Sequence, residues 1–322
     1  MSADRTPTER PTERTASDRV GVLDRPPPRD VLLIVLGVSA VSTSAPFIRA
    51  AAAPAFAVAF WRNAAAAGVL APWAWFRNRE ELTSLHGRER RLALAAGVLL
   101  ALHFATWIPS LSFTSVASST ALVATQPVWA ALIARSQGDR VPAMGWAGIW
   151  LAVLGAALLT GIDLHFDARA LGGDLLALVG GFFAAAYVTV GAEVRRTVTT
   201  TVYTTVCYAT CAVLLLGLIG VTRTRFVGFD ARTWWCIVGL TVGAQLLGHS
   251  VFNVVLKTTS PTVVSISILF EIVGAVALAW AFLDEVPRWQ AAPAAAVIVS
   301  GVVLVIRAGS RRPAVAGVPV VE

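Results

Sequence analysis

Apolar residues fall along this chain in ten blocks separated by short polar or charged stretches. Each block holds roughly 20 residues, the length of a helix that crosses a hydrocarbon core about 30 Å thick. A membrane barrel would instead show short segments in which apolar and polar residues alternate. The pattern therefore predicts an all-α membrane protein with ten transmembrane helices. The predicted spans are 31–48, 54–76, 92–110, 116–134, 143–160, 172–192, 200–221, 233–254, 261–283 and 290–306.

The composition agrees with this pattern. Of the 322 residues, 56% are hydrophobic and only 14% are charged, whereas soluble domains carry about 25% charged residues. The formal net charge is +7, a value that would suggest nucleic-acid binding in a soluble protein. In a membrane protein, arginine-rich loops facing an anionic cytoplasmic leaflet explain it better. We therefore expect the lipid bilayer as a partner, and no nucleic acid.

The arginine distribution predicts which ends of the spans face the cytoplasm. The stretch 1–29 is polar, charged and proline-rich, so it is predicted to be a disordered cytoplasmic tail. If ten spans alternate from there, 19 lysine and arginine residues face the cytoplasm and 6 face the outside. This bias predicts that both termini are cytoplasmic, with 308–322 as a second tail. Three arginines in the predicted external loop 222–232 are a local exception.

The two halves of the chain resemble each other at an offset of 145 residues. The Val-Pro pair at 141–142 aligns with the one at 286–287. At the same offset, Gln126 aligns with Glu271. Because each half holds five spans, an odd number, the second half enters the membrane inverted, as in transporters whose site lies at the repeat interface. We predict a first repeat at 30–160 and a second at 172–307, joined by an external linker at 161–171.

Four segments carry a resemblance to a known family. They are SAPFIR (44–49), FWRN (60–63), HFATWIPSLSFTSVASSTALVATQPVWAAL (103–132) and GHSVFNVVLKTTSPTVVSISILFEIVGAVALAWAFLDEVP (248–287). On these segments the chain resembles the drug/metabolite transporter superfamily, in its ten-span group with paired EamA-type repeats. The resemblance implies a bacterial inner-membrane exporter of small metabolites or drugs, which works by alternating access around a central cavity. Two departures are Gly138-Asp139, where the family often has Gly-Glu, and Ile272, where it often has proline.

Glu271 is the first candidate for a functional residue, because it lies in the apolar run LFEIVGAVALAW (269–280). A charge in mid-membrane costs about 2.5–3.5 kcal/mol on insertion scales. Helical spacing places Ser267 and Gly274 on the Glu271 face, and such small or polar residues suit a helix seam or a cavity wall. Glu271 can therefore hold a proton or a cation, or lock its helix to a neighbour. Its repeat counterpart Gln126 would supply a neutral hydrogen-bonding partner from the other half.

Arg62, His103 and His249 are further candidates inside predicted spans. Arg62 lies well within the span 54–76, so it can pair with an acid, cap carbonyl groups, receive an anionic solute or reach outward to the interface. His103 and His249 are near-equivalents in the two halves, and an inverted repeat would place them at opposite depths. Histidine titrates at about pH 6.5, so this pair can couple protons or form helix-packing hydrogen bonds.

Aromatic residues within spans could stack on an organic solute, although tryptophan at helix ends more often anchors the interface. The cavity candidates are Trp107, Trp129 and Tyr187. A different class of function rests on HSVFN, in which His249 and Asn253 lie one helical turn apart. An HxxxN motif occurs in rhomboid-type intramembrane proteases, so a membrane-embedded hydrolase is the alternative function. The chain has no matching GxSx nucleophile placed to act with this motif, and we therefore expect no enzyme.

The sequence shows no motif for a cofactor. No spacing of cysteine and histidine matches a zinc site, and the glycine-rich stretch 171–181 lacks the lysine and hydroxyl of a phosphate loop. The cysteines are predicted to be small buried side chains. We expect neither cofactor nor metal, so an ion or solute gradient would supply the energy. The sequence predicts a secondary transporter whose partners are a small organic solute, the bilayer and protons; a homodimer and a facilitative mechanism stay open.

Overall fold

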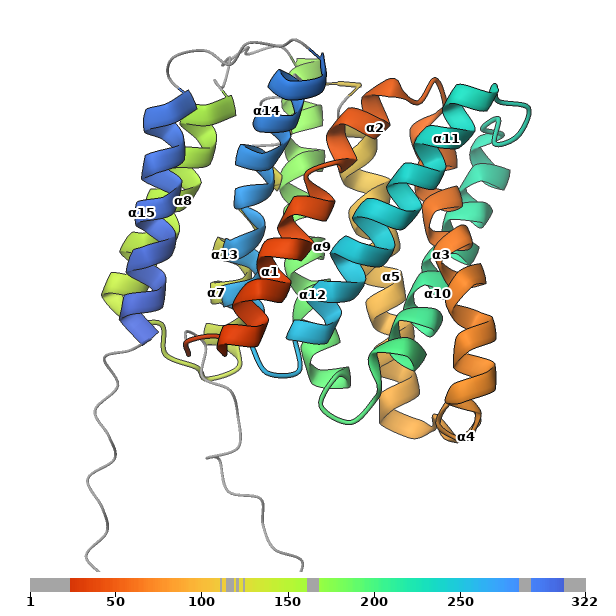
Figure 1. Cartoon of the computed structure of the whole chain (residues 1–322), viewed down its shortest axis with the longest axis horizontal. Helices are drawn as coiled ribbons and strands as arrows, with labels where there is room; N and C mark the ends of the chain where they lie inside the picture. Colours follow the sequence, from red (N-terminus) through yellow and green to blue (C-terminus); the bar gives the residue numbers. More distant parts are fainter. Residues whose placement is uncertain are drawn as a thin grey trace, which may run out of the picture.

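The structure is a computed structural model, and it describes residues 24–110, 112–113, 119, 122–123, 125–160, 168–283 and 291–309. All regular elements among these residues are helices, which confirms the predicted all-α class (Figure 1). The predicted tails, the linker 161–171 and the span 116–134 fall wholly or partly outside the described residues, and they stay predictions.

The described helices follow one another without an intervening strand. They are α1 (Pro28–Val41), α2 (Ser44–Ala50), α3 (Ala55–Arg77), α4 (Arg79–Ser84), α5 (Gly87–Ser110), α7 (Gln126–Ser136), α8 (Ala143–Thr160), α9 (Ala168–Val194), α10 (Thr200–Thr222), α11 (Ala231–Gly239), the π-helix η2 (Leu240–His249), α12 (Ser250–Val255), α13 (Pro261–Ile268), α14 (Phe270–Leu283) and α15 (Ala291–Gly309). The start of α1 and the end of α15 lie at the same end of the bundle, the lower end in Figure 1.

Four helical stretches among the described residues are long and apolar enough to cross a membrane. These stretches are α5, α9, α10 and the combined run Ala231–Val255. Shorter apolar helices cover Ala143–Leu158, Pro261–Gly274 and Ala296–Val305. A protein with several such helices fits the membrane character predicted from the hydrophobic blocks.

The largest core forms where α5 packs against α9 and α10, and where α3 packs against α10. Phe104, Tyr203 and Tyr208 are among its fully buried side chains. Cys207 and Cys211 lie in the same core with no exposed surface, so the prediction that they are buried hydrophobic residues is confirmed. This core borders the polar residues of the candidate site.

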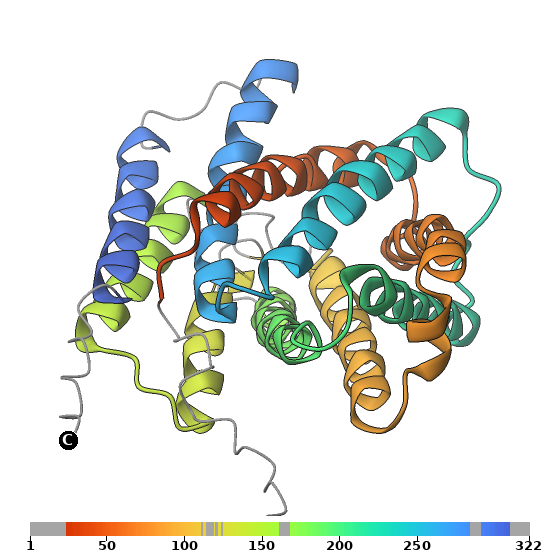
Figure 2. The same ribbon diagram turned by 60° about the horizontal axis from the view of Figure 1, so that its bottom comes forward.

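A second unit is the pair α8 and α15, which lies side by side at one edge of the bundle in Figure 2. The two helices approach through glycine. A Cβ added at Gly301 would lie 2.5 Å from the backbone nitrogen of Ala152 and 2.6 Å from the carbonyl oxygen of Gly148. Small residues permit such backbone contact between helices in lipid, where dispersion forces drive packing.

Capping residues determine where two helices of the second half begin. Asp230 precedes α11, and its Oδ1 accepts the Thr233 backbone N–H at 2.9 Å. The hydroxyl and backbone N–H of Thr233 hold the pKa of the exposed Asp230 carboxyl below its usual value. Ser260 caps α13 in the same manner, with Pro261 in the first helical position. The start of α13 is therefore fixed beside the cavity described below.

The α8–α15 contact can be tested with a matched pair of glycine substitutions. Gly301→Val should lower the free energy of unfolding by about 1–3 kcal/mol more than Gly217→Val, because overpacking displaces a neighbouring backbone. Gly217 on α10 has no atom within 4 Å of an added Cβ, so it controls for helix propensity. Thermal unfolding in detergent would measure both variants, and equal losses would contradict the packing described here.

Candidate functional site

Glu271 lies in the first turn of α14, directly after a break in the helix. The predicted span 261–283 was taken as one helix, but α13 ends at Ile268 and α14 begins at Phe270. Around the break, the Leu269 N–H binds the Ile266 carbonyl and the Ile272 N–H binds the Leu269 carbonyl. This tighter i→i−3 bonding interrupts the helix without the proline that the related family often has. Leu269 keeps right-handed helical dihedrals (φ −58°, ψ −26°), so the chain passes from α13 to α14 through a single tight turn.

The first turn of α14 packs against the break between α1 and α2. The Ser42 hydroxyl donates to the Val38 carbonyl at 2.8 Å and to the Glu271 carbonyl at 3.3 Å. A Cβ added at Gly274 would lie only 2.1 Å from Ser42 Oγ. This contact is a helix seam, as the small residues around Glu271 suggested. The Glu271 side chain itself is only partly buried.

Arg62, on α3, is the largest fully buried side chain among the described residues, with 1% of its surface exposed. Its Nε donates to Gln245 Oε1 at 2.8 Å, and its Nη1 lies 3.5 Å from the Ser44 hydroxyl. The Phe104 ring lies 4.9 Å from the guanidinium carbon. Arg62 is within electrostatic range of Glu271, but the ion pairs of the described residues do not include it.

Gln245 and Asn63 hold the inner edge of this guanidinium. Gln245 Nε2 donates to Asn63 Oδ1 at 3.1 Å, and Asn63 Nδ2 donates to the Ala59 carbonyl at 2.8 Å. Both amides are fully buried. Gln245 lies in the π-helix η2, a rare geometry that occurs most often at functional sites. The sequence analysis missed Gln245, although a lone amide in an apolar span is the same kind of signal as Arg62.

His103 and His249 both lie close to Phe104, whose ring centroid is 5.0 Å from that of His103 and 6.4 Å from that of His249. Both imidazoles are within electrostatic range of Arg62. His103 Nδ1 lies 3.0 Å from the Gly180 carbonyl, and because a carbonyl only accepts, Nδ1 carries the hydrogen. His103 therefore makes the helix-packing bond that was one of its two predicted roles.

Asn253 and Tyr187, which were predicted for different roles, pair with each other. Asn253 Nδ2 donates to the Tyr187 hydroxyl at 2.8 Å, and both side chains are buried. The Ser250 hydroxyl shares a 3.1 Å hydrogen bond with Tyr208. The hydrolase alternative needed Asn253 and His249 to act on a serine, and these contacts give it no support.

Three other candidates lie away from Glu271. Gln126 Nε2 donates to Ser265 Oγ at 3.0 Å, so it bonds to α13 and not to its repeat counterpart. Trp107 stacks on His103 with ring centroids 5.5 Å apart. Trp129 meets Phe182 edge-on at 5.7 Å. The indole N–H groups of both tryptophans are buried, and neither has a hydrogen-bond partner among the described residues.

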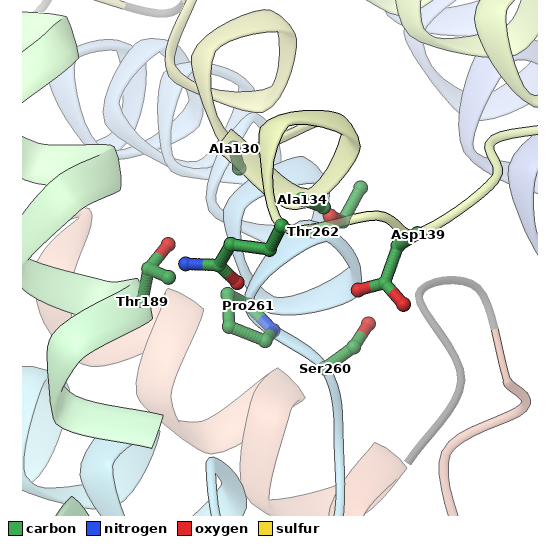
Figure 3. A pocket seen from close by; sticks show the side chains of 8 residues that line it. Ala130, Ala134, Asp139, Thr189, Ser260, Pro261 and Thr262 are labelled. Carbon is green, nitrogen blue, oxygen red and sulfur yellow. The ribbon is translucent and has the colours of Figure 1, made fainter. Parts of the chain in front are cut away.

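A small cavity lies at the end of the α7–α13 contact, next to α9 (Figure 3). In Figure 3 the Asp139 carboxylate and the Ser260 hydroxyl point toward each other across it. Its volume is about 60 Å³, whereas pockets for organic ligands measure roughly 300–1,000 Å³. The cavity can hold water, but it is too small for a metabolite. Its lining residues are Ala130, Ala134, Gln137, Asp139, Thr189, Ser260, Pro261 and Thr262.

Comparisons with known proteins identify the family. The model of the EamA-like transporter family matches residues 29–161 and again residues 171–307. An uncharacterized transporter from Archaeoglobus fulgidus is 22% identical over 253 residues, which are 77% of this chain and 86% of that protein. A solved crystal structure has the same fold, with a TM-score of 0.73 and 19% identity over 88% of this chain and 98% of that one. The chain belongs to the EamA-like transporter family, consistent with the drug/metabolite transporter superfamily, and is a membrane transporter.

Proposed function

We propose that this protein is a secondary transporter that exports a small organic solute across the bacterial inner membrane by alternating access. The observation that carries the proposal is a hydrogen bond between the two matched segments: Arg62 of the first segment binds Gln245 of the second. A buried polar contact at such an interface is where inverted-repeat transporters hold their solute. The hydrolase alternative has no comparable support.

The proposal includes ten spans arranged as two inverted five-helix repeats. Separate family matches at 29–161 and 171–307 support the proposed repeats at 30–160 and 172–307. The common position of the start of α1 and the end of α15 supports an even number of crossings. The excess of arginine on one side supports cytoplasmic termini.

Alternating access requires the contacts between the halves to break and re-form. Three such contacts are Arg62 to Gln245, Gln126 to Ser265, and Ser42 to the Glu271 carbonyl. A neutral hydrogen bond contributes about 0.5–1.5 kcal/mol net, and one to a charged group such as Arg62 about 1.5–3 kcal/mol. Bonds of this strength can break and re-form during transport.

Glu271 is the proposed coupling residue. It is partly exposed, lies beside a helix seam, and is within electrostatic range of a buried arginine. A carboxylate in that position can exchange a proton or a cation as the halves move. Its presence in an apolar helix is then explained by function, because a purely structural contact would not need a charge.

Substitution of Glu271 tests the coupling role. In liposomes with an internal pH-sensitive dye, pooled amino acids and cationic drugs should drive proton flux with the unmodified protein. Glu271→Gln should reduce this flux to the level of protein-free liposomes, whereas Glu80→Gln, at an exposed position on α4, should not. Solute flux that involves no proton movement and is unchanged by Glu271→Gln would make Glu271 structural and the carrier facilitative.

Cysteine labelling tests the orientation. In a variant whose three buried cysteines are replaced by alanine, Ser84→Cys places a single thiol at the end of α4, and Val227→Cys places one between α10 and α11. Figure 1 shows α4 and the start of α11 at opposite ends of the bundle. Both positions are exposed. A maleimide that does not cross membranes should label Val227→Cys in intact cells, and Ser84→Cys only after permeabilisation. The reverse pattern would contradict cytoplasmic termini.

A further inference from the structure

We infer that Arg62 is the anion-binding residue of the transport site and that it receives a carboxylate group of the solute. This inference rests on the proposed function and names a class of solute for it. It starts from the Arg62 Nη2 group, which has no hydrogen-bond partner among the residues that the structure describes.

The guanidinium of Arg62 has an outer edge with unfilled donors. Its Nη2 is buried and has no hydrogen-bond partner in the described part of the chain. Its Nη1 lies 3.5 Å from the Ser44 hydroxyl, beyond the usual range of about 2.7–3.2 Å. Buried polar groups are almost always satisfied in native proteins, so an exception in a charged group calls for a physical reason.

The inner edge of the same guanidinium is held firmly. The Gln245 side chain binds Nε, Asn63 binds Gln245, and the Ala59 carbonyl binds Asn63. This chain of buried amides fixes the plane of the guanidinium and leaves Nη1 and Nη2 together at its free end. Two parallel N–H donors in one plane match the two oxygens of a carboxylate.

The surroundings favour a single negative charge on the bound group. Phe104 lies against the guanidinium, and the charged or titratable groups within electrostatic range are Glu271, His103, His249, Tyr208 and Cys211. Arg62 is therefore the guanidinium that would face the bound group. One guanidinium balances one carboxylate, whereas a phosphate dianion would need further donors.

Arg195 shows what a structural buried arginine looks like in the same protein. It is 5% exposed, its Nε donates to the Asn253 carbonyl at 2.8 Å, and its Nη1 donates to the Val198 carbonyl. Both ends of that guanidinium therefore bind backbone. Arg62 differs because its outer edge has only the long 3.5 Å contact to Ser44 and an Nη2 without a partner among the described residues, so burial alone does not account for its arrangement.

A solute must displace Ser44 to reach Arg62, and Glu271 is its internal competitor. The long contact from Nη1 to Ser44 is the weakest bond at the site. Ser44 opens α2, directly after the break between α1 and α2, so movement at that break would uncover the free edge. Because the Glu271 carboxylate is the other anion in range, its neutralisation should favour a carboxylate from outside.

Binding of simple acids to the purified full-length protein tests the inference without transport. Benzoate, at constant ionic strength, should raise the melting temperature of the unmodified protein, while benzamide and benzylamine should not. Arg62→Gln should weaken benzoate binding by roughly tenfold or more, as expected for a lost charge-assisted pair. Arg195→Gln should keep the benzoate affinity, and Glu271→Gln should increase it.

A second measurement needs no ligand. Arg62→Met should leave the melting temperature unchanged or raise it, because it removes a buried charge with unfilled donors. Arg195→Met should lower it, because it frees two buried carbonyls. If Arg62→Met lowers the melting temperature as much as Arg195→Met does, and benzoate has no effect on the unmodified protein, the inference is overturned.

Other outcomes separate this inference from the proposed function. Equal stabilisation by benzoate and benzamide would indicate an apolar contact and overturn the carboxylate site. Stabilisation by inorganic phosphate but not by benzoate would overturn the choice of anion. Solute-driven flux in liposomes without any benzoate effect would leave the transporter in place and remove only the role given to Arg62.

Discussion

A guanidinium buried in an apolar helical bundle is the constraint around which this structure is arranged. An isolated charge in the protein interior costs several kcal/mol even after relaxation, so Arg62 needs polar neighbours on adjacent helices. The π-helix supplies Gln245, α3 supplies Asn63, and α2 supplies the distant hydroxyl of Ser44. The support is incomplete at one edge only. An incomplete shell around a fixed charge is what a binding site for an opposite charge requires.

The two matched segments are joined by two kinds of contact. α8 of the first segment and α15 of the second are joined through glycine, with backbone against backbone, and such a contact tolerates little change in spacing. Side-chain bonds such as Gln126 to Ser265 add to this contact between the same segments. Because each such bond contributes little net free energy, relative movement of the halves depends more on the helix contacts than on these bonds.

Much of the fold could be predicted from the sequence. Apolar blocks indicate which segments are helices inside the membrane, and a charged residue within such a block indicates a side chain that is buried for a reason. The helical class, the buried cysteines and the choice of Arg62 as a candidate followed from those two signals. The π-helix and the break at Leu269 did not, since periodicity cannot distinguish i→i−5 or i→i−3 bonding from an ordinary helix. Repeat alignment paired Gln126 with Glu271, but equivalent positions in a repeat share a role in the fold without being in contact.

Because Arg62 would interact with both the solute and Glu271, it would also decide whether solute binding favours or opposes proton binding. An anionic solute bound to Arg62 would neutralise the positive charge that favours an ionised Glu271. Solute binding would therefore favour protonation of Glu271, and protonation of Glu271 would favour solute binding. Because such linkage is reciprocal, proton and solute would cross together, and an exporter of this kind would run on the outward gradient of its solute. A cationic solute would compete with the proton for Glu271 and give exchange instead. In this site, the sign of the solute charge would decide whether the proton moves with the solute or against it.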